Sequence, residues 1–328
     1  MNIDIMALNE AIKKESQFVE RSLVEASKAV VGQREMLEGI LMGLLTGGHV
    51  LLEGVPGLAK TLTISTIAKT ISLNFQRIQF TPDLLPTDLI GTMIFNPKTG
   101  DFAPKKGPIF TNIVLADEIN RAPAKVQSAL LESMAEKQVT IGDTTYILDK
   151  PFLVLATQNP LEQEGTYPLP EAQMDRFMFK IVVTYPSKNE EMEILNKMQT
   201  DVMEQINPMI SREELMRAKG RVDMIYVDEK VKNYIVEIVM ATRKPEEYGL
   251  SHISNLLKVG GSPRATINLI RSAKAHAFLR GRGYVTAEDV KAIAYNVLRH
   301  RLILTYEAEA ENIKSEEIIK EVLNHVEV

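Results

Sequence analysis

The segment GVPGLAKT, from Gly54 to Thr61, decides which fold this sequence adopts. It follows the short apolar run HVLLE (49–53) and leads into KTLTISTIAKTI (60–71), which has the pattern of a helix. A glycine-rich turn between a strand and a helix lets backbone N–H groups converge on a phosphate without side chains in the way. The segment therefore predicts a phosphate-binding loop at the edge of a sheet.

Lys60 and Thr61 supply the functional groups of this loop. The lysine is a point charge for the β- and γ-phosphates of a nucleotide, and the threonine hydroxyl is a hard oxygen ligand for Mg²⁺. The common pattern G-x-x-x-x-G-K-[ST] has glycine where this chain has Ala59, so the backbone there has to accommodate a Cβ. A Gly/Pro turn before an ordinary helix is the alternative interpretation. The predicted nucleotide-binding residues of the loop are Gly54, Val55, Pro56, Gly57, Leu58, Ala59, Lys60, Thr61 and Leu62.

Two other apolar runs end in polar residues, and in an open α/β sheet such strand ends meet at the ligand-binding edge. IVLADE (113–118) ends in two acids, of which Asp117 suits the Mg²⁺ ion and Glu118 the attacking water. ATQNP (156–160) contains an uncharged amide, Asn159, that can orient a water against the γ-phosphate. The alternatives are an acidic strand end at an exposed loop and a plain Asn-Pro turn. The shared position at strand ends favours nucleotide chemistry.

Two arginines are candidates for contact with an anion. Arg176 lies just before the last predicted strand, and Arg264 lies in GGSPRAT (260–266). In this second motif Ser262 is typical of an N-cap and Pro263 of a first helical residue. Arg264 is therefore expected in the first turn of a helix, near its positive end. For each arginine, a surface salt bridge of little energetic value is the alternative.

Short apolar runs and helical stretches alternate over much of the chain, which predicts a doubly wound α/β domain with a parallel sheet. After about residue 200 the strand signal disappears, and capping-box patterns such as TAEDV (286–290) predict an all-helical domain. We expect an α/β domain over 1–200, opened by an amphipathic helix over 1–30, and a helical domain over 201–328. The predicted strands lie in 49–53, 113–117, 152–157 and 179–185.

Two further segments predict β-hairpins inserted between helices and strands. GTMIFNPKTGDFAPKKG (91–107) has β-like runs around a turn at residues 97–100. KQVTIGDTTYILD (137–149) places Gly142 and Asp143 between two alternating runs, which is a signal for a two-residue hairpin turn. Both hairpins interrupt the helix-to-strand connections of the α/β domain.

Composition narrows the possible classes of protein. The chain has 328 residues, of which 45% are hydrophobic, and a formal net charge of −5, so it can bury sizeable cores. It has no cysteine, which excludes disulfides and thiolate catalysis. Apolar runs stay well short of the roughly 18 residues that span a bilayer, and the N-terminus has no signal-peptide pattern. We expect a soluble, cytoplasmic protein that nucleic acid does not attract in general.

In this order, the motifs resemble the MoxR family of AAA+ ATPases, and the resemblance covers essentially the whole chain. The two predicted hairpins resemble the helix-2 insert and the hairpin before sensor 1, and Ala59 is the usual residue at its position in similar sequences. The resemblance implies a P-loop AAA+ domain followed by a helical lid domain. The matching segments are VVGQ (30–33), GVPGLAKT (54–61), LADEINRAP (115–123), LLESMAEKQVTI (130–141), ATQNPLEQEGTYPLPEAQMDRF (156–177) and GGSPRA (260–265).

The resemblance also implies a role for each matching residue in binding ATP and Mg²⁺. Lys60 and Thr61 correspond to the Walker A residues, and Asp117 and Glu118 to the Walker B pair. Asn159 corresponds to sensor 1. In this scheme Thr61 and Asp117 hold the metal ion, while Lys60, Glu118 and Asn159 act in catalysis.

The remaining correspondences concern neighbouring parts of an assembly. Arg176 corresponds to a finger that reaches the nucleotide of the next subunit, and Arg264 to sensor 2 on the lid. Val31-Gly32-Gln33 is implied to lie near the adenine, and Arg121 at a subunit interface. Family members assemble as rings, usually hexamers, and act as chaperone-like remodellers, typically on proteins with von Willebrand factor A domains.

The hypothesis that follows is Mg²⁺-dependent ATP hydrolysis that drives the remodelling or activation of partner proteins. A nucleic-acid motor is one alternative, against which the acidic balance counts. A nucleotide-gated module that does not hydrolyse is the other. The presence of Glu118, Asn159 and Arg176 counts against it, because a pure switch has no need of a group that activates water.

Overall fold

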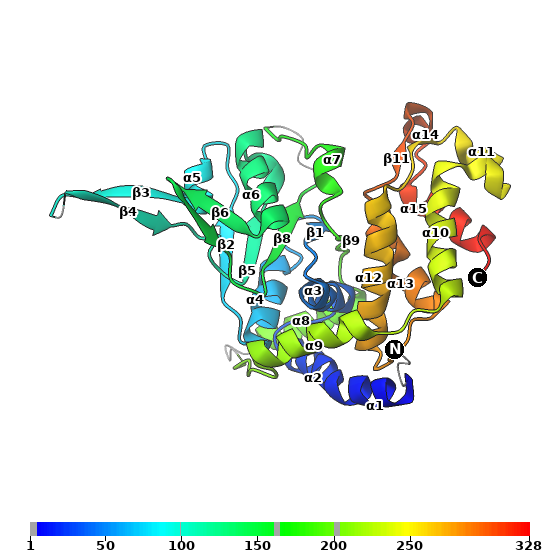
Figure 1. Cartoon of the computed structure of the whole chain (residues 1–328), viewed down its shortest axis with the longest axis horizontal. Coiled ribbons are helices and arrows are strands. Elements are labelled where there is room, and N and C mark those ends of the chain that lie inside the picture. Colours follow the sequence, from blue (N-terminus) through cyan, green and yellow to red (C-terminus); the bar gives the residue numbers. More distant parts are fainter. Residues whose placement is uncertain (1–4, 99, 161–164, 200–203) are drawn as a thin grey trace. The chain divides into compact units, whose positions relative to one another are not determined.

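The computed structural model describes residues 5–98, 100–160, 165–199 and 204–328, and it divides into two compact units (Figure 1). The first, called here the α/β unit, comprises Glu20–Phe177 and Ile181–Met216. The second, called here the helical unit, comprises the N-terminal residues up to Val19, the short segment Met178–Lys180, and Arg217–Val328. The boundary expected between residues 200 and 201 lies outside the described residues.

A five-stranded sheet forms the centre of the fold, in the strand order β2-β5-β8-β1-β9. The pairs β2–β5, β5–β8 and β8–β1 are parallel, which confirms the predicted doubly wound α/β fold. The strand β2 was missed in the sequence, because its residues FQRIQ bury only Ile78 deeply and so lack an apolar run. The strands are β1 (Val50–Glu53), β2 (Phe75–Gln79), β5 (Ile113–Asp117), β8 (Leu153–Gln158) and β9 (Phe179–Val182).

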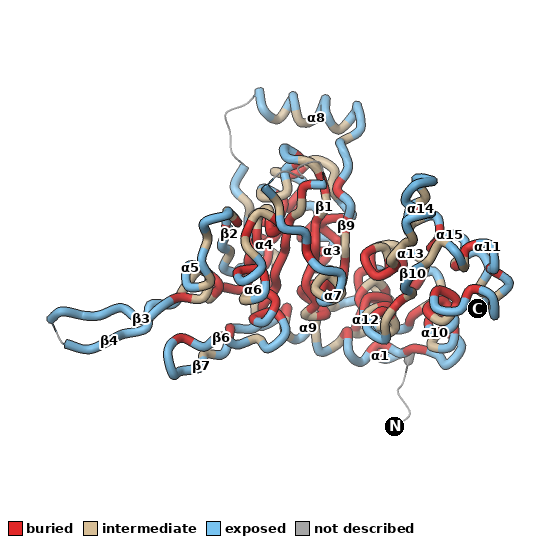
Figure 2. Tube along the Cα trace, turned by 90° about the horizontal axis from the view of Figure 1, so that it is seen from above, coloured by how far each residue is buried: buried red, intermediate tan, exposed pale blue. Residues whose placement is uncertain are grey.

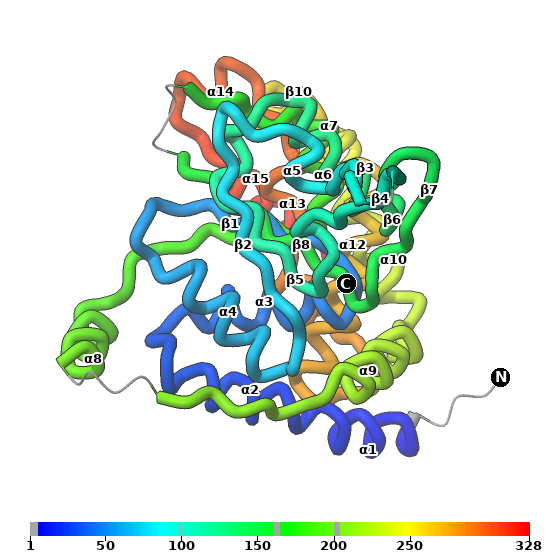
Figure 3. Tube along the Cα trace, turned by 90° about the vertical axis from the view of Figure 1, so that its left-hand side faces the viewer, coloured from blue at the N-terminus to red at the C-terminus, as the bar shows by residue number. Residues whose placement is uncertain are grey.

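Helices connect these strands, and the helix α8 (Lys188–Met198) is the one described next. The helix α8 lies away from the sheet in Figures 2 and 3, and all of its residues are exposed or half-buried. The helices up to residue 224 are α1 (Ile5–Glu15), α2 (Gln17–Ser27), α3 (Arg34–Thr46), α4 (Lys60–Thr70), α5 (Pro86–Ile90), the 3₁₀ turn η1 (Ile119–Arg121), α6 (Ala124–Glu136), α7 (Glu171–Met174), α8 (Lys188–Met198) and α9 (Arg212–Met224).

The amphipathic helix predicted over residues 1–30 is two helices in the described residues. The helix α1 ends at Glu15, and α2 begins at Gln17 and ends at Ser27. The hydroxyl of Ser16, between them, donates to the carbonyl of Lys13 at 3.4 Å. Serine side chains that bond to nearby backbone compete with helical hydrogen bonds, which accounts for a break at this residue.

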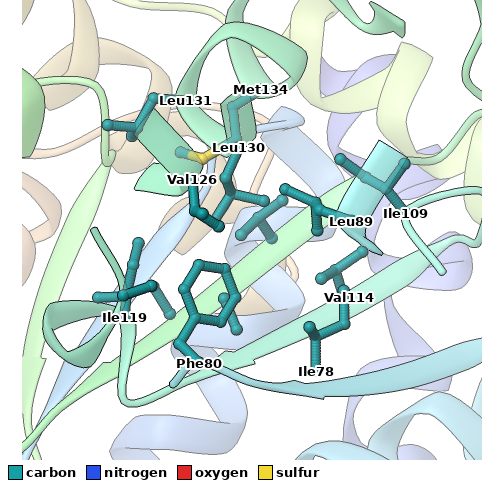
Figure 4. Packing of buried hydrophobic residues seen from close by; sticks show 14 of the residues in the cluster. Ile78, Phe80, Leu89, Ile109, Val114, Ile119, Val126, Leu130, Leu131 and Met134 are labelled. Atoms are coloured by element: carbon teal, nitrogen blue, oxygen red, sulfur yellow. The ribbon is translucent and has the colours of Figure 1, made fainter. Parts of the chain in front are cut away.

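A hydrophobic core on one side of the sheet fixes the strand ends that carry the polar candidates (Figure 4). Val114 and Ala116 of β5 are fully buried, and so is Ile119, which follows Glu118 directly. Leu130 of α6 packs in the same cluster. The residues directly before and after Asp117 and Glu118 are therefore buried, which holds the backbone of this pair in place. The two acids themselves lie at the edge of the sheet.

Both predicted hairpins are present. The first pairs β3 (Gly91–Asn96) with β4 (Asp101–Lys106), and the second pairs β6 (Gln138–Ile141) with β7 (Thr144–Ile147). The hairpin β3–β4 extends away from the sheet of the α/β unit in Figures 1 and 2, and almost all of its residues are exposed.

The helical unit is not entirely helical. A two-stranded antiparallel sheet joins β10 (Leu257–Val259) to β11 (Ile303–Leu304), and strands of three and two residues are too short to show a period in the sequence. None of the described helices is long and apolar enough to cross a membrane, and the cytoplasmic location stays a prediction. The remaining helices are α10 (Glu229–Arg243), η2 (Pro245–Tyr248), α11 (Ser251–Ser254), α12 (Pro263–Leu279), α13 (Ala287–Leu298), α14 (Tyr306–Ala310) and α15 (Ser315–His325).

Candidate functional site

The predicted phosphate loop runs from the end of β1 to the start of α4. Ala59, at the N-cap of α4, has the left-handed backbone angles φ 54° and ψ 21°. This conformation costs an L-residue about 1–2 kcal/mol, so the loop does accommodate a Cβ where glycine is common, but under strain. A Cβ at Gly54 would lie 2.7 Å from the carbonyl oxygen of Val183, so only glycine fits there.

Lys60 is held across this loop. Its Nζ donates a hydrogen bond to the carbonyl of Gly54 at 2.6 Å. Burial lowers the pKa of the Lys60 ammonium, and the nearby Asp117 and Glu118 carboxylates act in the opposite direction. A half-buried ammonium at the start of a helix, with one backbone acceptor, is suited to an incoming phosphate.

A cleft of about 480 Å³ brings together candidates from three parts of the α/β unit. Lys60, Thr61, Asp117, Glu118 and Asn159 all line it, although they come from α4, the end of β5 and the residue after β8. The shared cleft fits the expectation that carboxyl ends of parallel strands meet at one edge. The full lining is Pro56, Gly57, Leu58, Ala59, Lys60, Thr61, Leu62, Arg77, Gln79, Asp117, Glu118, Thr157 and Asn159.

Both carboxylate oxygens of Asp117 accept hydrogen bonds. The hydroxyl of Thr157 donates to Oδ1 at 2.6 Å, and Arg77 donates to Oδ2 from Nε at 2.9 Å and from Nη2 at 2.6 Å. Thr61 lines the same cleft, so its hydroxyl and the Asp117 carboxylate are candidate ligands for a hard cation. This donor set fits Mg²⁺, which commonly takes one or two protein oxygens and completes its shell with phosphate and water.

Glu118 is fixed by its backbone and by three side chains. Its φ of 55° is left-handed, and its N–H donates to the hydroxyl of Thr157 at 2.8 Å. Its carboxylate accepts from Gln79 Nε2 at 2.7 Å and forms an ion pair with Arg121, with Nε 3.2 Å from Oε2. Arg121, expected at a subunit interface, therefore contacts a candidate catalytic carboxylate of its own chain.

The sequence motifs did not identify Arg77, Gln79 and Thr157 as residues of this site. Gln79 pairs with Asp117 in the register of β2 and β5, which brings Arg77 and Gln79, on one face of β2, to the acids. The pairing of β2 with β5 is what brings Arg77 and Gln79 into the site, and no sequence motif indicates this pairing. Thr157 lies inside the quoted segment ATQNP, where Asn159 alone was selected.

A second cavity of the α/β unit, of about 160 Å³, includes the segment predicted to lie near the adenine. Val31, Gly32 and Gln33 line it together with Val183 and Glu190. A Cβ on Gly32 would come within 2.3 Å of the Glu190 carboxylate, so glycine lets that acid approach the chain closely. Because Val183 also packs against Gly54, this cavity adjoins the start of the phosphate loop.

The two predicted arginines belong to different units. Arg176 lines a third cavity of about 320 Å³, where its Nη1 donates to the carbonyl of Leu131 at 2.8 Å. Arg264 lies in the helical unit, in the first turn of α12, and Ser262 accepts a hydrogen bond from its N–H at 3.2 Å. The N-cap at Ser262 and the proline at the first helical position are confirmed.

Comparison with known proteins gives concordant matches along the chain. A model of the ATPase family associated with various cellular activities (AAA) matches residues 49–179, and a model of the AAA lid domain matches residues 250–322. Chaperone MoxR1 of Mycobacterium tuberculosis is 49% identical over 317 residues, which cover 97% of this chain and 84% of the relative. Protein MoxR of Paracoccus denitrificans is 32% identical over 296 residues, which cover 84% of this chain and 86% of the relative. A solved structure from Cytophaga hutchinsonii superposes with a TM-score of 0.93 at 53% identity and covers 99% of each chain.

Proposed function

This chain belongs to the MoxR family of AAA+ ATPases, and on that premise we propose that it hydrolyses ATP with Mg²⁺ in the 480 Å³ cleft. The observation that supports the proposal most directly is the convergence of Lys60, Thr61, Asp117, Glu118 and Asn159 on that one cleft. Phosphoryl transfer to water needs little covalent chemistry from a protein, and positioned charges of this kind supply most of the catalysis.

Substrate binding follows from the loop. We expect Lys60 to leave the Gly54 carbonyl and contact the β- and γ-phosphates, because a phosphate is a stronger acceptor than a peptide oxygen. Thr61 and Asp117 are the residues that would hold Mg²⁺, which neutralises the charge that develops on the phosphate oxygens. The strained backbone at Ala59 aims N–H groups at the start of α4 toward the same phosphates.

Two other residues that line the cleft are expected to activate the attacking water. Glu118 is the carboxylate we expect to accept a proton from the attacking water, and Asn159 is the amide we expect to orient this water. The N–H of Glu118 is tied to Thr157, so its backbone does not drift when the carboxylate changes partners. Its present partners, Gln79 and Arg121, both contact Oε2 of this carboxylate.

Arg176 belongs to a different part of the reaction. It lines another cavity of the α/β unit, so we infer that it reaches the nucleotide of a neighbouring subunit in a ring, by the family pattern a hexamer. A finger supplied by a neighbour increases turnover by about 10³–10⁵ in related phosphoryl transfers. In the same scheme Val31-Gly32-Gln33 lies near the adenine, and Arg264 connects the helical unit to the nucleotide.

Work on a partner protein is the biological part of the proposal. The hairpin β3–β4 exposes apolar side chains that a soluble chain does not need for folding, among them Phe95 at 50% and Phe102 at 64% exposure. Exposed apolar groups in one place commonly mark a contact with another protein. One relative is named a chaperone, and we expect this chain to remodel a client, with a von Willebrand factor A domain as the first candidate.

The test is ATP turnover per chain, with Mg²⁺, as the protein concentration is raised. We expect turnover to rise with assembly and then to saturate, and Arg176→Ala to lower the plateau by at least 10³-fold while the variant still binds ATP. Lys125→Ala, a change at the solvent-exposed start of α6, is the matched control and leaves the plateau unchanged. An Arg176→Ala plateau equal to that of the wild type would refute the shared site, and absence of turnover at every concentration would refute hydrolysis.

A further inference from the structure

The side chain of Gln127, on α6, joins two separate segments of the α/β unit. Its amide nitrogen donates to the carbonyl oxygens of Ile119 at 3.2 Å, Ala122 at 3.1 Å and Tyr167 at 2.9 Å. Ile119 and Ala122 belong to the turn that follows Glu118, whereas Tyr167 lies in the segment that leads into α7. One side chain, which is only 1% exposed, therefore ties these two stretches of backbone together.

Only a hydrogen-bond donor suits this buried position. An amide nitrogen carries two hydrogens, so the three carbonyl oxygens share them. A carboxylate here would face three acceptors, and an apolar side chain would leave the carbonyls without the partner they now have. The N–H of Tyr167 also donates to the carbonyl of Asn120 at 2.6 Å, which joins the same two segments directly. Satisfied networks of this kind hold their members in one arrangement.

The helix α6 also contacts the arginine that follows the second segment. Arg176, just after α7, donates from Nη1 to the carbonyl oxygen of Leu131 at 2.8 Å. Leu131 lies four residues after Gln127, so the two are about one helical turn apart on the same face of α6. The helix is therefore a common support for the turn after Glu118 and for Arg176.

We propose that Gln127 is a positioning residue for two active sites at once. The inference rests on the proposed function, in which Glu118 acts in the site of its own subunit and Arg176 in the site of a neighbour. Because Gln127 holds the turn after Glu118 against the segment before Arg176, it sets the place of both groups. Loss of its amide therefore impairs one site through Glu118 and a second site through Arg176.

A merely structural role for Gln127 predicts a different result. Its loss would then reduce the amount of folded protein but leave the turnover of each folded site unchanged. In the described part of the chain Gln127 is not among the residues that line the 480 Å³ cleft, so we expect ATP affinity to be preserved. A misplacement of reacting groups by about 1 Å costs about 100-fold in rate, and this is the loss of turnover expected for Gln127→Met. Methionine nearly keeps the length of the side chain but has no donor.

The experiment mixes variant and wild-type full-length chains in rising proportion and measures ATP turnover, with sizing and urea unfolding to establish that each variant folds and assembles. A shared site takes Glu118 from one subunit and Arg176 from the next, so a chain that lacks one of these groups disables one site. Glu118→Gln and Arg176→Ala are expected to leave about half of the wild-type turnover in an equal mixture. Gln127→Met disables two sites and is expected to leave about one quarter.

Mixtures of two variants test the two roles of Gln127 separately. Glu118→Gln with Arg176→Ala is expected to regain about one quarter of the wild-type turnover, since some sites then receive an intact group from each subunit. Gln127→Met is expected to regain no turnover with either partner. The control Gln76→Met makes the same chemical change at an exposed residue of β2 and is expected to leave turnover unchanged at every proportion.

The outcomes separate this inference from the proposed function. A linear decline for Gln127→Met in wild-type mixtures, or recovery of turnover with either partner, would overturn the role in two sites. If Gln127→Met does not fold, Gln127→Asn takes its place, because its amide is one methylene too short to reach all three carbonyls and the same decline is expected. If Glu118→Gln and Arg176→Ala fail to restore each other, the shared site itself is wrong, whatever the behaviour of Gln127.

Discussion

Asp289→Asn is expected to destabilise the helical unit by about 3 kcal/mol. Asp289 is fully buried near the start of α13, and its carboxylate accepts from His276 Nδ1 at 2.6 Å and from Arg282 at 2.7 and 2.5 Å. It also accepts from the N–H and the hydroxyl of Thr286, at 2.8 and 2.9 Å, which completes the capping box predicted from TAEDV. Asparagine keeps the volume but replaces one acceptor oxygen with a donor that faces other donors.

The magnitude follows from what the substitution leaves behind. Removing one partner of a buried ion pair costs about 3–5 kcal/mol, because the other charge stays buried without compensation. Arg282 keeps 26% of its side chain exposed and can turn partly toward water, which places the expected loss at the lower end of that range. Glu288→Gln, one residue earlier and 81% exposed, is the control and is expected to change stability by less than about 0.5 kcal/mol.

The assay is urea unfolding followed by far-UV circular dichroism, repeated from neutral to acid pH. Burial raises the pKa of the Asp289 carboxyl, but hydrogen bonds from His276 and Arg282 outweigh this effect and hold the pKa well below its usual range. Because the folded value lies below the unfolded value of about 3.9, the stabilisation is present above that pH and is lost as the pH falls below it. The difference in free energy of unfolding between the wild type and Asp289→Asn should therefore decrease at acid pH. A variant as stable as the wild type at neutral pH would refute the reasoning.

Two further predictions concern the cleft. Thr157→Val keeps the shape of a side chain that is 1% exposed but removes the hydroxyl shared by Asp117 and the Glu118 N–H. We expect it to lower ATP turnover about ten-fold or more and to cost about 1–3 kcal/mol in urea unfolding, whereas wild-type turnover would show that the hydroxyl does not position the acids. Glu118→Gln is expected to bind ATP with unchanged affinity and to hydrolyse it at least about 100-fold more slowly in a single-turnover assay, and a smaller loss would assign the base to another group.

The parts of the site that could be predicted are those encoded by a local segment. The run before Gly54 is apolar because β1 is covered on both faces, and the same holds for the run before Asp117. Each apolar run therefore predicts both a strand and the position of the polar group at its end. Ala59 is a similar case, since its place in the loop pattern indicated a backbone suited to glycine, and its φ is left-handed.

The parts that could not be predicted depend on which strands become neighbours. Arg77 and Gln79 lie on an edge strand whose polar residues give no apolar run, and only pairing with β5 carries them to the acids. The break at Ser16 and the small sheet β10–β11 depend on single hydrogen bonds and on strands of two or three residues. Periodicity averages over longer windows and does not detect them.

Backbone strain gives an argument for the site that is independent of its side chains. Of the described residues other than glycine, six have a positive φ. Ser72, Lys137 and Asn312 are three of these, and each lies just after a helix, where a left-handed residue is ordinary.

The other three have no such explanation. Gln33 and Ala59 precede helices, and Glu118 precedes a 3₁₀ turn, with φ of 55°, 54° and 55°. These are the positions expected near the adenine, at the phosphates and at the attacking water. Strain of about 1–3 kcal/mol at each persists only where the surrounding structure imposes it, and such residues gather at functional sites. Since a left-handed residue before a helix turns successive N–H groups toward one point, the strain at Ala59 supports an anionic group at the start of α4, the place expected for the phosphates.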